Sequence, residues 1–391
     1  MEKRNDKPYQ YWLHNLPGIG DRTIKKLLDV FGSPRQIYRT GEKRLREVLL
    51  PGQVQTVIAH KKVWDLTGAY QQLEEKEIRF FTLQDQEFPD RLRRLSHPPY
   101  GIYCKGNLPD PQAPAAALIG ARECSEYGRS MAKAFGKAFG QAGVALISGM
   151  ARGIDGIGQQ AALEGGGRTY AVLGCGVDIC YPASNRQLYD SILKQGGGIL
   201  SVFPPGTDPR KGNFPERNRI VAGLSDLILV VEARQKSGTW ITVDMALEQG
   251  KEVYAVPGRL SDRLSDGCNL LLRQGAGIAL SPTDLLTELA VLRNQQKITD
   301  RSVSCEKSSV GIKWIDGEKE TQERDASKSM SWLLALLDFT PISPDQLLER
   351  MREKGIQMEL PELLQELVKL CMEGRVCHVS GNLFYKREGG I

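Results

Sequence analysis

The chain has 391 residues, of which 41% are hydrophobic and 25% charged, and its formal net charge is +5. This composition supplies apolar material for one large core and one or two small ones, and so predicts two or three domains. The amino-terminal MEKRNDKPYQYW is charged and no run approaches the roughly 18 apolar residues that span a bilayer, so we expect a cytoplasmic protein without a membrane segment.

Residues 1–70 are predicted to form a helical domain. A glycine turn containing Gly18 and Gly20 precedes an amphipathic helix that ends near Phe31, a pattern that resembles a helix-hairpin-helix in a SAM-like domain. Glycines in such a hairpin let backbone N–H groups approach a phosphate, so Gly18, Gly20 and Lys25 are candidate accessory DNA contacts. Residues 1–65 hold 13 Lys and Arg against 7 Asp and Glu, whereas the rest holds 39 against 40. The alternatives are a hairpin that only joins two packed helices and an ordinary solvated basic surface.

Within a predicted domain of residues 71–290, residues 115–281 alternate short apolar runs with helix-length segments such as Ser130 to Gln141 and Thr239 to Gln249. Regular alternation predicts right-handed crossovers and a parallel sheet covered by helices on both faces, which is a Rossmann-like α/β domain. The predicted strands are Ala115 to Gly120, Val144 to Ser148, Thr169 to Leu173, Gly198 to Val202, Leu227 to Val231 and Glu252 to Val256.

The chain turns polar over residues 291–328, which are predicted to be a linker. Residues 329–391 then recover a compact pattern of three helices and a two-stranded hairpin, which predicts a small winged-helix-like domain. The helices are expected near Trp332 to Leu337, Ser343 to Met351 and Pro361 to Glu373, and the strands at Val376 to Val379 and Leu383 to Lys386.

The loops of the central sheet lack the fingerprints of common cofactors. The loop Gly120 to Gly128 (GARECSEYG) is not G-x-G-x-x-G, and the next strand ends in Ile147-Ser148-Gly149 without an acid for a ribose hydroxyl. No G-x-x-x-x-G-K-[ST] loop is present. We therefore expect no nicotinamide, flavin or nucleotide cofactor.

Catalytic and metal-binding constellations are also missing from the predicted sheet. The four histidines, His14, His60, His97 and His378, all lie outside residues 98–377, which excludes Ser-His and Cys-His schemes and a histidine metal cage there. Eight scattered cysteines without a C-x-x-C pair predict reduced thiols rather than disulfides or zinc. Carboxylates near strand ends could act as acid and base, but helix caps and loop hydrogen bonds are their commoner use, so we expect no enzyme and no metal. These carboxylates are Asp155, Asp178, Asp226 and Glu232.

Two loops have the composition of an anion or nucleic-acid site. The loop Ser148 to Asp155 (SGMARGID) opens a helix with small residues, which favours anion binding and is equally typical of a tight strand–helix turn. The stretch Pro209 to Arg219 (PRKGNFPERNR) places cations around one aromatic ring. Single-stranded DNA needs cations to replace counterions and an exposed ring to stack on a base. In the alternative, Phe214 fills the core and the arginines pair with Glu216 or Asp208.

These loops belong to a longer series of motifs that resembles the DprA/Smf family, the DNA-processing proteins of natural transformation. The resemblance covers about residues 10–290 and, more weakly, the predicted winged helix. The motifs, in order, are LIGAR (118–122) with YG (127–128), SGMARGID (148–155), AVLGCGVD (171–178) with YP (181–182), FPERNRIVAGLS (214–225), VVEA (230–233) with SG (237–238), and AVPG (255–258).

The resemblance implies a single-stranded DNA-binding homodimer that loads the RecA recombinase onto incoming DNA. It implies that Arg122 and Lys211 contact phosphate and that Phe214 stacks on a base. Other residues are expected to complete the positive pocket or to give close backbone approach: Arg152, Arg217, Asn218 and Arg219, and Gly120, Ser148 and Gly149. The family commonly has a histidine where this chain has Gln159 and a glutamate where it has Val202, which puts local hydrogen bonding in doubt.

Two other functions compete with DNA binding. Related Rossmann-like nucleotide N-glycoside hydrolases carry a glycine-rich G-T followed closely by glutamate, whereas here Gly238-Thr239 is followed by Trp240 and the next acid is Asp244. A DNA-tethered adaptor whose central domain binds only protein would bury Phe214 and leave Lys211 merely solvated.

Overall fold

The computed structural model describes residues 6–293 and, beyond them, residues 333, 336–337, 342–354, 356, 358, 363, 366–367, 370, 376–379 and 383–386. The chain divides into two compact units, residues 1–307 and 308–391. Among the helices in the described part of the chain, none combines the length and apolar character that a membrane crossing requires.

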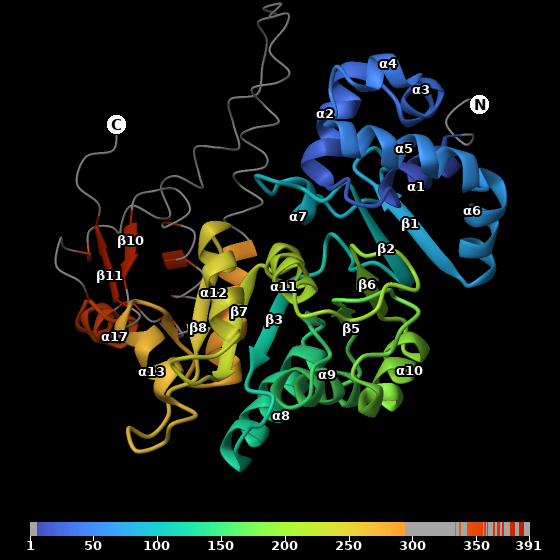
Figure 1. Ribbon diagram of the computed structural model, residues 1–391. Helices are drawn as coiled ribbons and strands as arrows, with labels where there is room; N and C mark the ends of the chain where they lie inside the picture. Colours follow the sequence, from blue (N-terminus) through green and yellow to red (C-terminus); the bar gives the residue numbers. More distant parts are fainter. Residues whose placement is uncertain are drawn as a thin grey trace, which may run out of the picture. The chain divides into compact units, whose positions relative to one another are not determined.

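A nine-stranded sheet runs through the described part of the first unit, in the order β1-β2-β6-β5-β4-β3-β7-β8-β9 (Figure 1). The strands β3 to β9 pair with one another in parallel, whereas β2 pairs antiparallel with both β1 and β6. The strands are β1 Ile78–Thr82, β2 Gly101–Gly106, β3 Ala115–Gly120, β4 Ala145–Ser148, β5 Thr169–Val172, β6 Gly198–Ser201, β7 Leu227–Glu232, β8 Glu252–Ala255 and β9 Gly277–Ile278.

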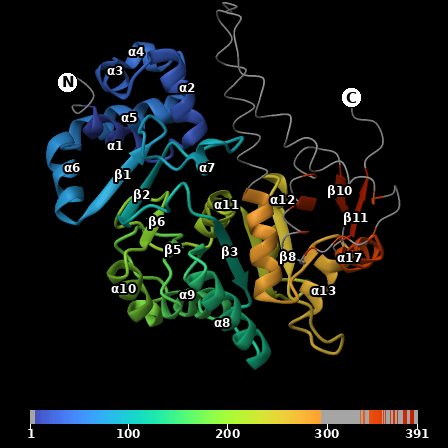
Figure 2. The same ribbon diagram turned by 180° about the vertical axis from the view of Figure 1, so that it is seen from behind.

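Helices cover both faces of this sheet, as the two opposite views show (Figures 1 and 2). Alternate residues of a strand point to opposite faces, so Ala116 and Leu118 of β3 pack in one core while Ala115 and Ala117 pack in another. The first core contains α8 Glu126–Gln141 and α9 Ile154–Glu164, and the second contains α11 Asn213–Leu224, α12 Thr239–Glu248 and α13 Asp266–Arg273. The short α7 Asp90–Arg93 packs with the second core, and α10 Arg186–Lys194, preceded by the 3-10 turn Ala183–Asn185, packs beside β5 and β6.

All six predicted strands are present within one residue of their predicted ends, and the mixed α/β class is confirmed. The pattern could be recognised because β3 to β7 are buried on both faces and so consist mainly of apolar residues. The antiparallel ribbon β1–β2 and the two-residue β9 were not predicted.

The described amino-terminal residues form six helices that pack against the β1–β2 side of the sheet. Tyr11 and Trp12 are buried in the same core as Tyr103 of β2 and Leu173 after β5. Lys7 forms an ion pair with Asp85 at 2.5 Å across this boundary. The helices are α1 Lys7–His14, α2 Asp21–Phe31, α3 Pro34–Arg39, α4 Glu42–Leu45, α5 Pro51–Val63 and α6 Leu66–Glu75.

The described part of the second unit contains α17 Pro344–Glu353 and the antiparallel pair β10 Val376–Val379 and β11 Leu383–Lys386. Ser343 begins α17 with a reciprocal capping box, because its Oγ accepts from the Gln346 amide and the Gln346 side chain accepts from the Ser343 amide. The two strands of the predicted hairpin are present as β10 and β11. Residues 282–293 are helical, so the predicted linker begins inside a helix; residues 294–328 lie outside the described residues, as does most of the predicted helix at 361–373.

Candidate functional site

A small pocket of about 50 Å³ lies where the loops after β3, β4 and β5 meet the start of α11. The carboxyl ends of parallel strands form one edge of a sheet, which is where open α/β sheets bind ligands. Three arginines, one phenylalanine and one tyrosine contribute to its walls. The lining residues are Arg122, Gly149, Ala151, Arg152, Leu173, Gly174, Tyr181, Pro182, Phe214 and Arg217.

The loop between β4 and α9 has a tightly fixed backbone. Met150 has a φ of +51° and Gly153 a φ of +76°, a conformation that favours glycine. A Cβ on Gly153 would overlap the carbonyl oxygen of Ala121, and the Ile154 amide donates to that same oxygen at 3.1 Å. The loops that carry Arg122 and Arg152 are therefore held against each other.

Gln159, where the family commonly has a histidine, is fully buried beneath this loop. Its side chain accepts from the Met150 amide at 3.1 Å and donates to the Thr169 hydroxyl and the Tyr170 carbonyl at 3.0 and 3.2 Å. Glutamine thus makes a complete set of hydrogen bonds here, and the loop keeps its support.

Arg217 lies at the bottom of the pocket and is only 6% exposed. Its Nη1 is 3.8 Å from Asp155 Oδ2, and that carboxylate also accepts from the Gly149 amide at 3.2 Å. Burial raises the pKa of Asp155 and lowers that of Arg217, while each opposes the shift of the other. Arg217 Nε has no hydrogen-bond partner among the described atoms, so this guanidinium retains an unused donor.

Phe214 is half-buried and lies between cations. The guanidinium carbons of Arg122 and Arg217 are 5.5 and 5.7 Å from the centre of its ring, within the range of cation–π attraction. The Tyr181 ring is 6.0 Å away at 40°. The ring belongs to none of the buried core clusters, so it is an aromatic surface at the pocket rather than a core residue.

The helical start of α11 separates residues that are adjacent in sequence. Phe214 and Arg217 are three positions apart and share a face, whereas Arg219 is rotated by roughly 200° from Arg217. Arg219 accordingly pairs with Glu216 and donates to the His97 carbonyl, away from the pocket. Lys211 precedes the helix and is exposed, and Asn218 is half-buried and does not line the pocket.

The small residues predicted to approach DNA pack closely against other parts of the protein, and Gly149 also lines the pocket. Ser148 is fully buried and its hydroxyl donates to the Leu118 carbonyl at 2.6 Å. A Cβ on Gly120 would meet the Glu232 carbonyl at 2.8 Å and the Ile154 side chain at 2.9 Å, and one on Gly149 would overlap the Arg217 guanidinium. These positions support the pocket by allowing close packing behind it.

The accessory candidates lie on the helical region. Gly18, Gly20 and Lys25 are all exposed, and a Cβ on either glycine would meet no described atom within 4 Å. The adjacent Asp21 accepts from the Tyr100 amide at 3.1 Å. None of the three residues lines the pocket.

The crevice between β3 and β7, where the strand order reverses, is filled by a carboxylate of the protein itself. Glu232 is fully buried and accepts from the amide of Ser125 at 2.9 Å and from its hydroxyl. A Cβ on Gly128 would overlap this carboxylate. Glu232 therefore occupies the amino terminus of α8, where a dinucleotide fold would place a pyrophosphate.

The other strand-end carboxylates also have protein partners. Asp226 pairs with Arg91 through two hydrogen bonds of 2.9 and 2.8 Å, and Asp178 accepts from the Gly206 amide at 2.8 Å. Among the described residues no cluster of three His, Cys, Asp or Glu side chains could hold a metal ion. The arrangement thus offers cations and an aromatic ring rather than a free acid–base pair.

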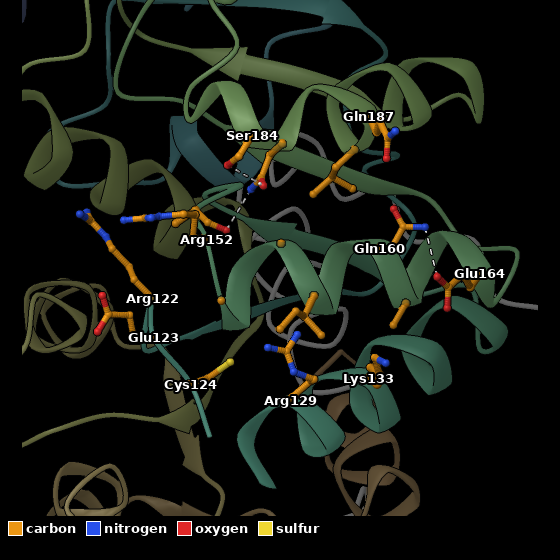
Figure 3. A pocket seen from close by; sticks show the side chains of 17 residues that line it. Arg122, Glu123, Cys124, Arg129, Lys133, Arg152, Gln160, Glu164, Ser184 and Gln187 are labelled. Atoms are coloured by element: carbon orange, nitrogen blue, oxygen red, sulfur yellow. Dashed lines mark hydrogen bonds between the residues drawn. The ribbon is translucent and has the colours of Figure 1, made fainter. Parts of the chain in front are cut away.

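A larger cavity of about 590 Å³ adjoins the pocket through Arg122, Ala151 and Arg152, which line both. It lies over α9, with α8 on one side and the start of α10 on the other (Figure 3). Arg129 and Lys133 of α8 line it.

Several residues of this site were missed by sequence reasoning. Tyr181, Pro182 and Gly174 line the pocket, and Asp155 fixes Arg217. Gly174, Tyr181 and Pro182 belong to the motifs AVLGCGVD and YP, whose composition and spacing assign these three residues no role, and Asp155 was identified only as a strand-end carboxylate, without its partner Arg217. The strand order, which brings the end of β5 beside that of β4, is what places them here.

Comparison with known proteins identifies relatives over most of the chain. The family model of the DNA recombination-mediator protein A matches residues 79–290. The DNA processing protein DprA of Streptococcus pneumoniae is 37% identical over 287 residues, which cover 72% of this chain and 97% of that protein. Protein Smf of Escherichia coli is 32% identical over 316 residues, covering 79% and 78%.

A solved structure agrees with the sequence relatives. The X-ray structure of the S. pneumoniae DNA processing protein A superposes with a TM-score of 0.60 and 32% identity, covering 72% of this chain and 97% of that one. The arginine and phenylalanine pocket described above lies inside residues 79–290, which the family model matches.

Proposed function

Because the chain belongs to the DNA recombination-mediator protein A family, also named DprA/Smf, we propose that it binds single-stranded DNA at the pocket formed by Arg122, Arg152, Phe214 and Arg217. The observation that carries the proposal is the partly exposed Phe214 ring, which has two guanidinium groups within cation–π range. A base that stacks on this ring would leave its phosphates beside the arginines.

The pocket would bind DNA through two kinds of contact, charge neutralisation of phosphates and stacking on a base. Arg122, Arg152 and the exposed Lys211 would neutralise phosphates and release counterions, which makes affinity depend on salt. Phe214 would contribute stacking, worth about 1 to 3 kcal/mol per base and nearly independent of salt. Arg217 is too buried to reach a phosphate at the surface and would orient the ring.

We propose a non-catalytic role. Each of the four strand-end carboxylates is engaged by a protein partner, and Glu232 fills the place of a nucleotide phosphate. This disfavours the alternative N-glycoside hydrolase, which needs a free carboxylate beside its substrate. The exposure of Lys211 and the partial exposure of Phe214 likewise favour DNA binding over a protein-only adaptor.

The remaining features of the family resemblance are proposed together. As a recombination mediator of natural transformation, the protein would load RecA onto incoming DNA in the cytoplasm. A homodimer would cover large apolar side chains that are exposed at the β7–β8–β9 end of the sheet. These are Leu247, Leu260, Ile278 and Leu280. The carboxyl-terminal unit is proposed to be a winged helix.

The test is a titration of the full chain with labelled oligothymidine at several salt concentrations. Phe214→Ala should weaken binding about tenfold with little change in salt slope, whereas Lys211→Ala should reduce the slope by about 0.7, the value for one phosphate contact on a single strand. Lys137→Ala, an exposed lysine on α8 that lines neither cavity, is the matched control and should match the wild type. Unchanged affinity in both Phe214→Ala and Lys211→Ala would refute the proposed binding site. Release of free base from nucleoside monophosphates would instead support the N-glycoside hydrolase.

A further inference from the structure

The cavity beside the pocket has its charges separated along its length. Arg122 and Arg152 lie at the end that it shares with the Phe214 pocket, and Arg129 and Lys133 follow along α8 (Figure 3). Glu164 lies at the far end, where it accepts from Gln160 at 3.2 Å. Four cations thus line the cavity between the pocket and Glu164, and one exposed carboxylate, Glu123, lies next to Arg122 among them.

The cations of α8 are available to a ligand. Arg129 and Lys133 are four positions apart, so they lie one turn apart on the same side of the helix. Arg129 pairs with Glu126 at 3.3 Å, but the two side chains are 44% and 90% exposed, and such surface pairs contribute little. Lys133 is exposed. Arg129 can leave Glu126, and Lys133 can leave solvent, to contact a phosphate with little loss of free energy.

The opposite wall and the floor combine uncharged polar side chains with small residues and the apolar Ile157 and Leu188. Ser184, Asn185 and Gln187 come from the turn before α10 and its first residues, and Gln160 comes from α9. Hydroxyl and amide groups both donate and accept hydrogen bonds, so they suit the edges of any base. From Gly153 to Glu164 the floor extends roughly 16 Å at 1.5 Å per residue, which is room for a few nucleotides.

We infer that this groove, lined by Arg129 and Lys133 on one wall and by Gln160 and Gln187 on the other, is the path by which single-stranded DNA continues from the Phe214 pocket. The inference rests on the proposed DNA binding at that pocket and extends it from one stacked base to a tract. The phosphates lie along α8 and the bases face α9 and α10. Glu164 repels the backbone and so marks where the tract ends.

The groove predicts a dependence on oligonucleotide length. A short oligothymidine that only fills the Phe214 pocket should not distinguish Lys133→Ala or Arg129→Ala from wild type. An oligothymidine several nucleotides longer should bind each variant about fivefold more weakly at roughly 0.1 M salt, and the double variant should lose about 1.4 from its salt slope. Replacing the added nucleotides with abasic ones should keep this loss, because it concerns phosphates.

The control is Lys137→Ala, which removes an exposed lysine of the same helix, one turn further along and outside the groove. If the Arg129 and Lys133 variants match Lys137→Ala at every length while wild type still needs Phe214, the groove path is overturned and the pocket stands. If wild type does not bind oligothymidine of any length, the pocket proposal has failed, and the groove with it.

Discussion

Alanine at position 149 would test how the pocket is built. Gly149 is buried in the wall of the pocket, and a Cβ there would overlap the guanidinium of Arg217. The backbone cannot retreat freely, because its amide donates to Asp155 at 3.2 Å. In Gly149→Ala the arginine must therefore leave its place beside Asp155.

The expected cost follows from what the arginine leaves behind. Asp155 is only 7% exposed, and breaking a buried ion pair by removing one partner costs 3 to 5 kcal/mol. Because Arg217 is displaced toward the pocket rather than removed, we take the lower end, about 3 kcal/mol. Displacement also removes one of the two cations that flank Phe214, so affinity for oligothymidine should fall as well.

Urea unfolding of the two variants Gly149→Ala and Gly212→Ala gives the comparison. Gly212 precedes α11 with φ −67° and ψ −16°, and a Cβ there meets no described atom within 4 Å, so alanine should be neutral or stabilise by up to about 1 kcal/mol. Equal midpoints and equal slopes for the two variants would show that close packing at residue 149 does not hold Arg217 in place.

Three other expectations concern groups outside the pocket. Burial lowers the pKa of His14 from 6.5 to about 4, so as the pH falls the unfolded state takes up a proton before the folded state does. The free energy of unfolding should therefore fall by up to about 3 kcal/mol between pH 6.5 and pH 4. Urea titrations of His14→Gln should lack this part of the loss. Asp226→Asn should cost about 3 kcal/mol because it removes the charged partner of Arg91, whose side chain is only 13% exposed. Asp90→Asn, in an exposed pair, should change stability by less than about 0.5 kcal/mol, and thermal unfolding distinguishes the two variants. Glu232→Ala should cost about 2 kcal/mol and speed amide exchange at the start of α8, and unchanged exchange there would contradict its capping role.

The sheet was predictable because its central strands are apolar on both faces and short enough to be told from helices. The β1–β2 ribbon was not, because its strands are separated by 18 residues that include only a four-residue helix. Antiparallel pairing of such distant segments depends on partners such as β6 that no local pattern reveals.

The sequence predicted which residue types make up the candidate site, but not how their side chains are arranged. The basic stretch around Phe214 was identified, but treating it as a loop gave Arg217 and Arg219 the same role. Once α11 starts at Asn213, helical rotation sends one arginine to Asp155 and the other to Glu216. The groove cations Arg129 and Lys133 carried no signal, because charged residues four apart on a helix are ordinary on any solvated face.

The aromatic core shared by α1 and β2 has a consequence for any shortened form of the protein. A fragment that began at residue 71 would lose Tyr11 and Trp12 and would leave Tyr103 without its hydrogen bonds to the His14 and Asn15 side chains. It would also uncover Leu173, which adjoins Gly174 in the wall of the pocket. Such a fragment should aggregate and be poorly soluble, so the smallest soluble fragment of this chain should retain its first helix.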